Sequence, residues 1–193
     1  VVPPGRAGTL GARCVTPGLA VRGAGDRVEA TIVAGGGITH LDAGHPDLPT
    51  DPATNTAGLA AHEVRRRSGA LSNGIALRVI KGLPLSGGQG GSAASAVAAA
   101  VAVNELLGRP LDMQGLLEAC LSAEEVVAGR HADNLAPSLL GGLVLIRSID
   151  PLDVVRLPVP ENLFVVLASP AQRLRTVAAR RVPAAPRARR CSL

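Results

Sequence analysis

Residues 82–95, with the sequence GLPLSGGQGGSAAS, have types and spacing that could bind phosphate. They lead into an alanine-rich stretch of helical composition that ends before Gly108 and Pro110. Glycines ahead of a helix N-terminus let the backbone approach an anion, and the free N–H groups and the helix dipole stabilise its charge. The segment therefore predicts a phosphate-binding loop. The alternative is a glycine-rich turn that only allows close packing against the helix.

This loop differs from the two most familiar phosphate-binding types. A P-loop requires GK[ST] after its glycines, and no such residues follow here. The GxGxxG spacing of a dinucleotide-binding fold is also not met. If the segment binds phosphate, it does so as a third type of loop.

A carboxylate in a later helix is the second candidate for chemistry. We expect this helix to begin after Asp112 as its N-cap and to continue to about residue 128. Glu124 shares one stripe with Met113, Leu117, Cys120 and Val127, whereas the opposite face carries Glu118, Ser122 and Glu125. Glu124 is therefore predicted to point inward and Glu125 outward. An inward carboxylate needs a metal ion or a basic group beside it.

The elements that must position these residues are both strands and helices. Residues 21–41 predict two strands of an antiparallel pair, residues 42–55 a loop, and residues 56–67 a helix that ends in a solvated run of Arg65, Arg66 and Arg67. Residues 74–80, with the sequence GIALRVI, predict the strand that delivers the chain into the glycine loop. The segment HADNLAPSLLGGLVLI predicts a tight loop, a helical turn and a strand, and residues 163–168 predict a further buried strand.

Composition excludes several classes of function. The net charge is +5, but seven of the twenty basic residues follow Ala171, so residues 1–170 carry 13 basic against 15 acidic residues. The basic end alone does not predict nucleic-acid binding, and the sequence has no aromatic stacking platform because it contains one Phe and no Tyr or Trp. Three dispersed cysteines favour a reducing compartment, and no apolar run is long enough to cross a membrane. We therefore expect a cytoplasmic protein.

The motifs together resemble the GHMP small-molecule kinases. PLSGGQGGSAAS, which begins at Pro84, is similar to their phosphate-binding motif PxxxGLGSSAA. TDPATNTAGLAA, GRHADNLAPSLLGG and TVAAR further resemble the homoserine kinases of this family in order and spacing, over residues 26–180. The resemblance implies an α+β fold like domain 2 of ribosomal protein S5, and transfer of the ATP γ-phosphoryl group to L-homoserine in threonine biosynthesis.

The resemblance also implies roles for individual residues. Ser92 and Glu124 would bind Mg²⁺, and with Arg180 they would form the catalytic set. Arg180 would hold the substrate carboxylate. The residues implied for ATP are Asn55, Pro84, Gly88, Gln89, Gly90, Gly91, Ser92, Ala93 and Ala94, and those implied for the substrate are His131, Asp133, Asn134, Thr176 and Arg180.

Each role has a simpler alternative. His131 could satisfy a loop carbonyl, and Arg180 stands among many arginines near the end of the sequence. We expect His40, His45 and His62 to be surface residues. No membrane or nucleic-acid partner is expected, and a homodimer is left open.

The sequence departs from the family pattern at both ends. The first motif of the family is approximately NLGxGFDxxGLA, and here TLGARCVTPGLA places Thr9 at its Asn and Val15 at its Asp. In the glycine loop, Gly91 replaces a serine and Gln89 a leucine. We expect residues 1–170 to form the ATP-binding domain, and residues 171–193 to be the start of a largely missing C-terminal domain and a disordered basic tail. The open alternatives are another GHMP kinase, such as one acting on mevalonate or a sugar, and a non-catalytic nucleotide-binding fragment.

Overall fold

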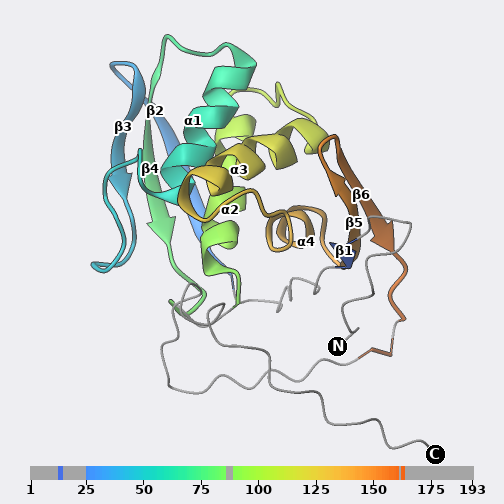
Figure 1. Ribbon diagram of the computed structural model, residues 1–193. Helices are drawn as coiled ribbons and strands as arrows, with labels where there is room; N and C mark the ends of the chain where they lie inside the picture. The colour runs from blue at the N-terminus through green and yellow to red at the C-terminus, as the bar shows by residue number, and fades with distance from the viewer. Residues whose placement is uncertain (1–12, 15–24, 86–88, 161, 164–193) are drawn as a thin grey trace, which may run out of the picture.

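The computed structural model describes residues 13–14, 25–85, 89–160 and 162–163. Helices α1 and α2 lie beside a sheet of β2, β4 and β3, and a second sheet of β1, β5 and β6 lies beyond α3 and α4 (Figure 1). This arrangement confirms the predicted α+β class. The helices are α1 (Thr56–Ser68), α2 (Gly91–Leu106), α3 (Met113–Val127) and α4 (Leu135–Leu140).

The first sheet has a strand order that the sequence did not suggest. Its members are β2 (Arg27–Val33), β3 (Gly37–Asp42) and β4 (Gly74–Ile80). β4 lies between the other two, antiparallel to β2 and parallel to β3. The predicted antiparallel pair within residues 21–41 is therefore wrong, although both of its strands exist. β4 begins at Gly74, between the end of β2 and the start of β3. A Cβ added to Gly74 would lie 2.9 Å from the Ala34 carbonyl oxygen, so this close approach of the strands favours glycine.

Helix α2 is the centre of the molecule. It packs against α1, α3, α4 and β2, and its buried residues are mostly alanines and valines whose small side chains allow close approach. The alanine-rich sequence predicts a helix over residues 92–107, which is confirmed within one residue at each end. Asn104 on its last turn is 4% exposed, and its side-chain amide both donates to and accepts from the backbone of Leu111, which fixes the turn into α3.

Helix α3 begins where the sequence predicted. The Asp112 carboxylate accepts from the Gly115 N–H at 2.8 Å and caps the helix. The inward stripe is confirmed for Leu117 and Cys120, which are buried, but Met113 is 50% and Val127 49% exposed. These two residues lie at the ends of the helix, where fewer elements cover the stripe.

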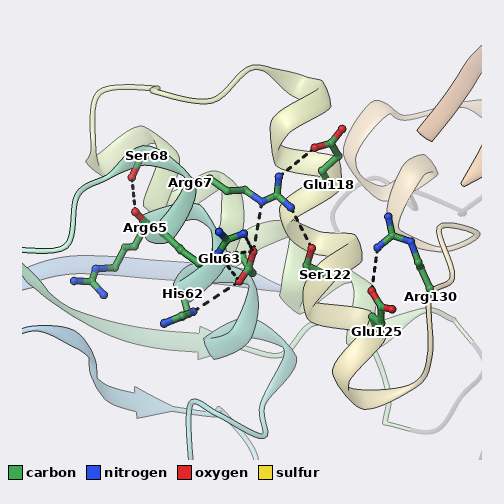
Figure 2. A network of polar contacts seen from close by, with 10 residues as sticks. His62, Glu63, Arg65, Arg67, Ser68, Glu118, Ser122, Glu125 and Arg130 are labelled. Atoms are coloured by element: carbon green, nitrogen blue, oxygen red, sulfur yellow. Dashed lines mark hydrogen bonds and ion pairs between the residues drawn. The ribbon is translucent and has the colours of Figure 1, made fainter. Parts of the chain in front are cut away.

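The arginines that end α1 are not the solvated run expected. Arg65 is 2% exposed and donates to the carbonyl oxygens of Leu71 and Asn73, so it fixes the connection from α1 to β4. Arg67 reaches from α1 to Glu118 and Ser122 on α3 (Figure 2). Only Arg66, 55% exposed in its pair with Glu63, matches the expectation. The correction follows from the position of α1 beside α3 and the β4 connection.

The second sheet consists of β1 (Arg13–Cys14), β5 (Leu143–Ile149) and β6 (Leu152–Leu157), all paired antiparallel. α4 and β5 confirm the helical turn and the strand predicted for HADNLAPSLLGGLVLI, whereas β6 was not predicted. Of the strand expected at 163–168, residues 164–168 lie outside the described residues. No helix of the described part is long and apolar enough to span a bilayer.

Candidate active site

The glycine loop joins β4 to α2 and ends in a backbone conformation that favours glycine. Gly90 is the N-cap of α2 and has φ of 70°, in the left-handed region that side chains rarely adopt. The helix follows at once: Ser92 is exposed, Ala93 is buried and Ala94 is half-buried. The loop therefore presents the N–H groups at the beginning of α2 beside an exposed hydroxyl, an arrangement that suits an anion.

The loop lies beside residues 131–134, which we call the HADN segment. A Cβ added to Gly90 would lie 3.2 Å from Asn134 Oδ1 and 3.4 Å from Asn134 Cβ. The exposed Asn134 thus lies against Gly90 of the loop, although the two residues are far apart in the sequence. His131 is half-buried, with Nε2 3.2 Å from the position of a Cβ on Gly129, and Asp133 is also half-buried. Two segments that are far apart in the sequence, and that the motifs single out separately, therefore lie side by side.

A buried polar cluster beneath the loop was not predicted. The Lys81 ammonium pairs with Asp26 and donates to the Gly91 carbonyl oxygen at 3.1 Å and to Ser95 Oγ at 2.9 Å. The side chain of Asp26 is 0% exposed and that of Lys81 is 9% exposed. Burial alone would raise the pKa of Asp26, but hydrogen bonds from Lys81, Ser95 and Gly82 and the charge of Lys81 outweigh it and lower the pKa.

Glu124 lies on the face of α3 that packs against α2. Cys120 Sγ lies 3.9 Å from the Ala96 carbonyl oxygen. Glu124 follows Cys120 by about one turn of α3, and Ser92 precedes Ala96 by about one turn of α2. Glu124 is half-buried, whereas Glu125 is exposed and pairs with Arg130. The predicted inward and outward orientations are confirmed.

Ser92 and Glu124 carry the kinds of donor atom that could hold a magnesium ion. One hydroxyl and one carboxylate are hard oxygen donors, and Mg²⁺ is commonly held by one or two protein oxygens together with water and phosphate. In the described part of the chain, His, Cys, Asp and Glu side chains nowhere gather in the threes that a fully protein-built site would need. Ser92 and Glu124 are two candidate protein ligands, beside which phosphate and water would supply the others.

Asn55 has a structural role in α1. It is 7% exposed, its Oδ1 accepts from the Ala57 N–H, and its Nδ2 donates to the Pro49 carbonyl oxygen. The next residue, Thr56, donates through Oγ1 to the Ser92 carbonyl oxygen at 3.3 Å. Asn55 thus fixes the start of α1 beside the start of α2. Its predicted contact with adenine stays a prediction.

Several predicted residues lie outside the described part. These are Thr9, Val15, Gly88, Thr176 and Arg180. Pro84 and Gln89 are described on either side of the undescribed positions 86–88. Among the histidines expected at the surface, His40 and His62 are exposed, whereas His45 is half-buried.

Comparison with known proteins decides the family. The model of the GHMP kinases N-terminal domain matches residues 55–142, which include the glycine loop, Glu124 and the HADN segment. Residues 55–142 belong to a GHMP kinases N-terminal domain. The chain is 47% identical over 141 residues to homoserine kinase of Chlorobium phaeovibrioides, covering 70% of this chain and 44% of the relative. It is 42% identical over 160 residues to homoserine kinase of Arabidopsis thaliana, covering 79% of this chain and 43% of the relative.

A solved structure extends the likeness to three dimensions. The crystal structure of homoserine kinase from Cytophaga hutchinsonii matches with a TM-score of 0.71 at 37% identity, over 80% of this chain and 50% of that chain. The chain therefore spans half or less of the length of these proteins. The resemblance to homoserine kinases inferred from the motifs is confirmed.

Proposed function

We propose that this GHMP kinase domain serves a homoserine kinase, which transfers the γ-phosphoryl group of ATP to the hydroxyl of L-homoserine in threonine biosynthesis. The observation that carries the proposal is the contact of Asn134 with Gly90, because it sets the HADN segment against the phosphate-binding loop. Similarity to homoserine kinases of 42–47% identity supports the choice of substrate. The proposal assigns residues 1–170 to the ATP-binding domain and places the protein in the cytoplasm.

Phosphoryl transfer depends mainly on positioning and on neutralising charge at the phosphate oxygens. The backbone N–H groups that follow Gly90 would hold the nucleotide phosphates at the positive end of α2. Ser92 and Glu124 would hold Mg²⁺, which supplies charge neutralisation on the phosphates. Asn134, together with His131 and Asp133, would orient the amino-acid substrate on the other side of the loop.

The test is product formation by the purified protein with ATP and Mg²⁺. We expect ADP release that depends on L-homoserine, with O-phospho-L-homoserine identified by mass spectrometry. Release that depends instead on mevalonate or a sugar would favour another GHMP kinase. ATP binding with no release for any acceptor would favour a non-catalytic nucleotide-binding protein, an alternative that Thr9 and Val15 in the first motif favour.

Two adjacent glutamates provide a matched pair of variants. Glu124→Gln removes the carboxylate that would hold Mg²⁺, and we expect it to lower kcat by about a hundredfold or more, as loss of a group that neutralises transition-state charge does. Glu125→Gln changes the next residue, which is exposed and paired with Arg130, and should leave kcat unchanged. Equal effects of the two substitutions would contradict the role of Glu124.

A further inference from the structure

Lys81 is the single lysine in a sequence that has twenty lysines and arginines in total. An ammonium group has three N–H donors, and those of Lys81 meet three acceptors: Asp26 Oδ2, Ser95 Oγ and the Gly91 carbonyl oxygen. A planar guanidinium cannot direct three donors from one nitrogen. The position therefore requires lysine even in a chain that otherwise uses arginine.

Both carboxylate oxygens of Asp26 also accept hydrogen bonds. Its Oδ1 accepts from the backbone N–H groups of Gly82 at 3.0 Å and Leu83 at 3.2 Å, while Oδ2 accepts from Lys81 and Ser95. Every polar group of this buried cluster thus has a partner, which makes its geometry rigid. A partly satisfied cluster would instead be costly to bury.

The cluster joins three parts of the chain at the glycine loop. Asp26 directly precedes β2, Lys81 directly follows β4, and Ser95 lies in α2. Gly82 packs on the backbone of Gly25, where an added Cβ would lie 2.0 Å from the Gly25 carbonyl oxygen. The start of the loop and the start of α2 are therefore both fixed relative to β2.

We propose that Asp26, Lys81 and Ser95 are positioning residues that fix the two ends of the glycine loop, at Gly82–Leu83 and at Gly91, for phosphate binding without contacting the nucleotide. This proposal rests on the proposed function of the loop. Each Lys81 donor is already used within the protein, so none is left for a phosphate. A lone ammonium at the N-terminal end of α2 would be opposed by the helix dipole, and Asp26 offsets that repulsion.

The first test compares ATP affinity among variants, with Mg²⁺–ATP titrated calorimetrically. We expect Asp26→Asn, Ser95→Ala and Lys81→Arg each to raise the Kd of ATP by about tenfold or more, because small misplacements of a positioned site are costly. The KM of L-homoserine should stay within twofold. Full ATP affinity in Lys81→Arg would overturn the proposal, since it would mean that positive charge alone suffices.

The control for general destabilisation is Glu118→Gln. This substitution removes a partner of Arg67 between α1 and α3, away from the loop, and should leave the Kd of ATP unchanged. Ser95→Ala keeps the ion pair, so it reports on the cluster even where a charge substitution prevents folding.

A second measurement does not depend on nucleotide. Amide hydrogen exchange at Gly82 and Leu83 should be faster in folded Asp26→Asn than in the wild type, because these N–H groups lose their charged acceptor. Unchanged exchange at both amides would overturn the proposal. Failure of the wild type to bind ATP would contradict the proposed function instead, and the exchange comparison would still decide whether the cluster holds the loop.

Discussion

Gly90 combines a left-handed backbone conformation with a close approach of Asn134. Gly90→Ala would hold an alanine at φ of 70° and bring its Cβ to 3.2 Å from Asn134 Oδ1. We expect the free energy of unfolding to fall by about 1–2 kcal/mol from the left-handed backbone alone, and ATP to bind more weakly. Denaturant unfolding and ATP titration measure the two effects.

The matched control is Gly69→Ala. Gly69 has a φ of 71°, but an added Cβ there would meet no atom within 4 Å. This variant should lose similar stability and keep its ATP affinity. If both variants lost ATP affinity equally, the loop contact would not be the cause.

Cys120 is a buried thiol that should be chemically inert in the folded protein. Burial, reinforced by the charge of Glu124, raises its pKa to about 12. Since the thiolate is the reactive form, we expect iodoacetamide at about pH 8 to leave the Cys120 peptide unmodified until the protein is unfolded. Peptide mass spectrometry measures the modification. Equal labelling of folded and unfolded protein would contradict the burial of Cys120 between α2 and α3.

At the residue scale, the sequence predicts candidate residues that lie in motifs, but not the buried residues that hold the glycine loop. Gly90, Asn134 and the orientation of Glu124 followed from motif and helical period. Asp26 and Lys81 belong to no chemical motif, because their role depends on β2 and β4 being neighbours. The one signal available was that a sequence rich in arginine has a single lysine directly before the loop.

Among the elements, α3 depends on its cap. Asp112→Ala should lower the free energy of unfolding by about 1 kcal/mol, because the Gly115 N–H loses its acceptor. Asp112→Ser, which keeps an oxygen at the cap, should retain most of the stability. Urea unfolding compares the variants. A loss as large in Asp112→Ser as in Asp112→Ala would show that the cap hydrogen bond is not what stabilises α3.

The helices could be predicted from the sequence more fully than the sheets. Caps and stop signals are local, so α1, α2 and α3 begin and end within one residue of the prediction. Strand order depends on distant contacts. The pairing of β2 and β3 with β4 is possible because Gly74 has no side chain, and nothing in residues 21–41 alone could reveal it.

For the molecule as a whole, two carboxylates with lowered pKa values make the free energy of unfolding depend on pH. The pKa of Asp26 is lowered because its hydrogen bonds outweigh the opposing effect of burial, and that of Glu63 is lowered mainly by its hydrogen bond from Arg66. In such cases the unfolded chain binds protons more readily than the folded chain. The stabilisation is therefore fully present above the unfolded value, 3.8 for Asp26, and is lost as the pH falls through the lower folded value.

Comparison with Asp26→Asn tests this for the whole chain. The variant lacks the carboxylate, so we expect it to be less stable than the wild type at about pH 7. The gap should narrow at about pH 3, because this is below the unfolded value of 3.8 and the unfolded chain then binds the proton more readily. Urea unfolding at both pH values gives the gap. Glu105→Gln, which removes a pair exposed on both sides, should cost little at either pH. A gap of the same size at both pH values would contradict a lowered pKa for Asp26, and would mean that the cluster stabilises the fold through packing rather than through the charge of Asp26.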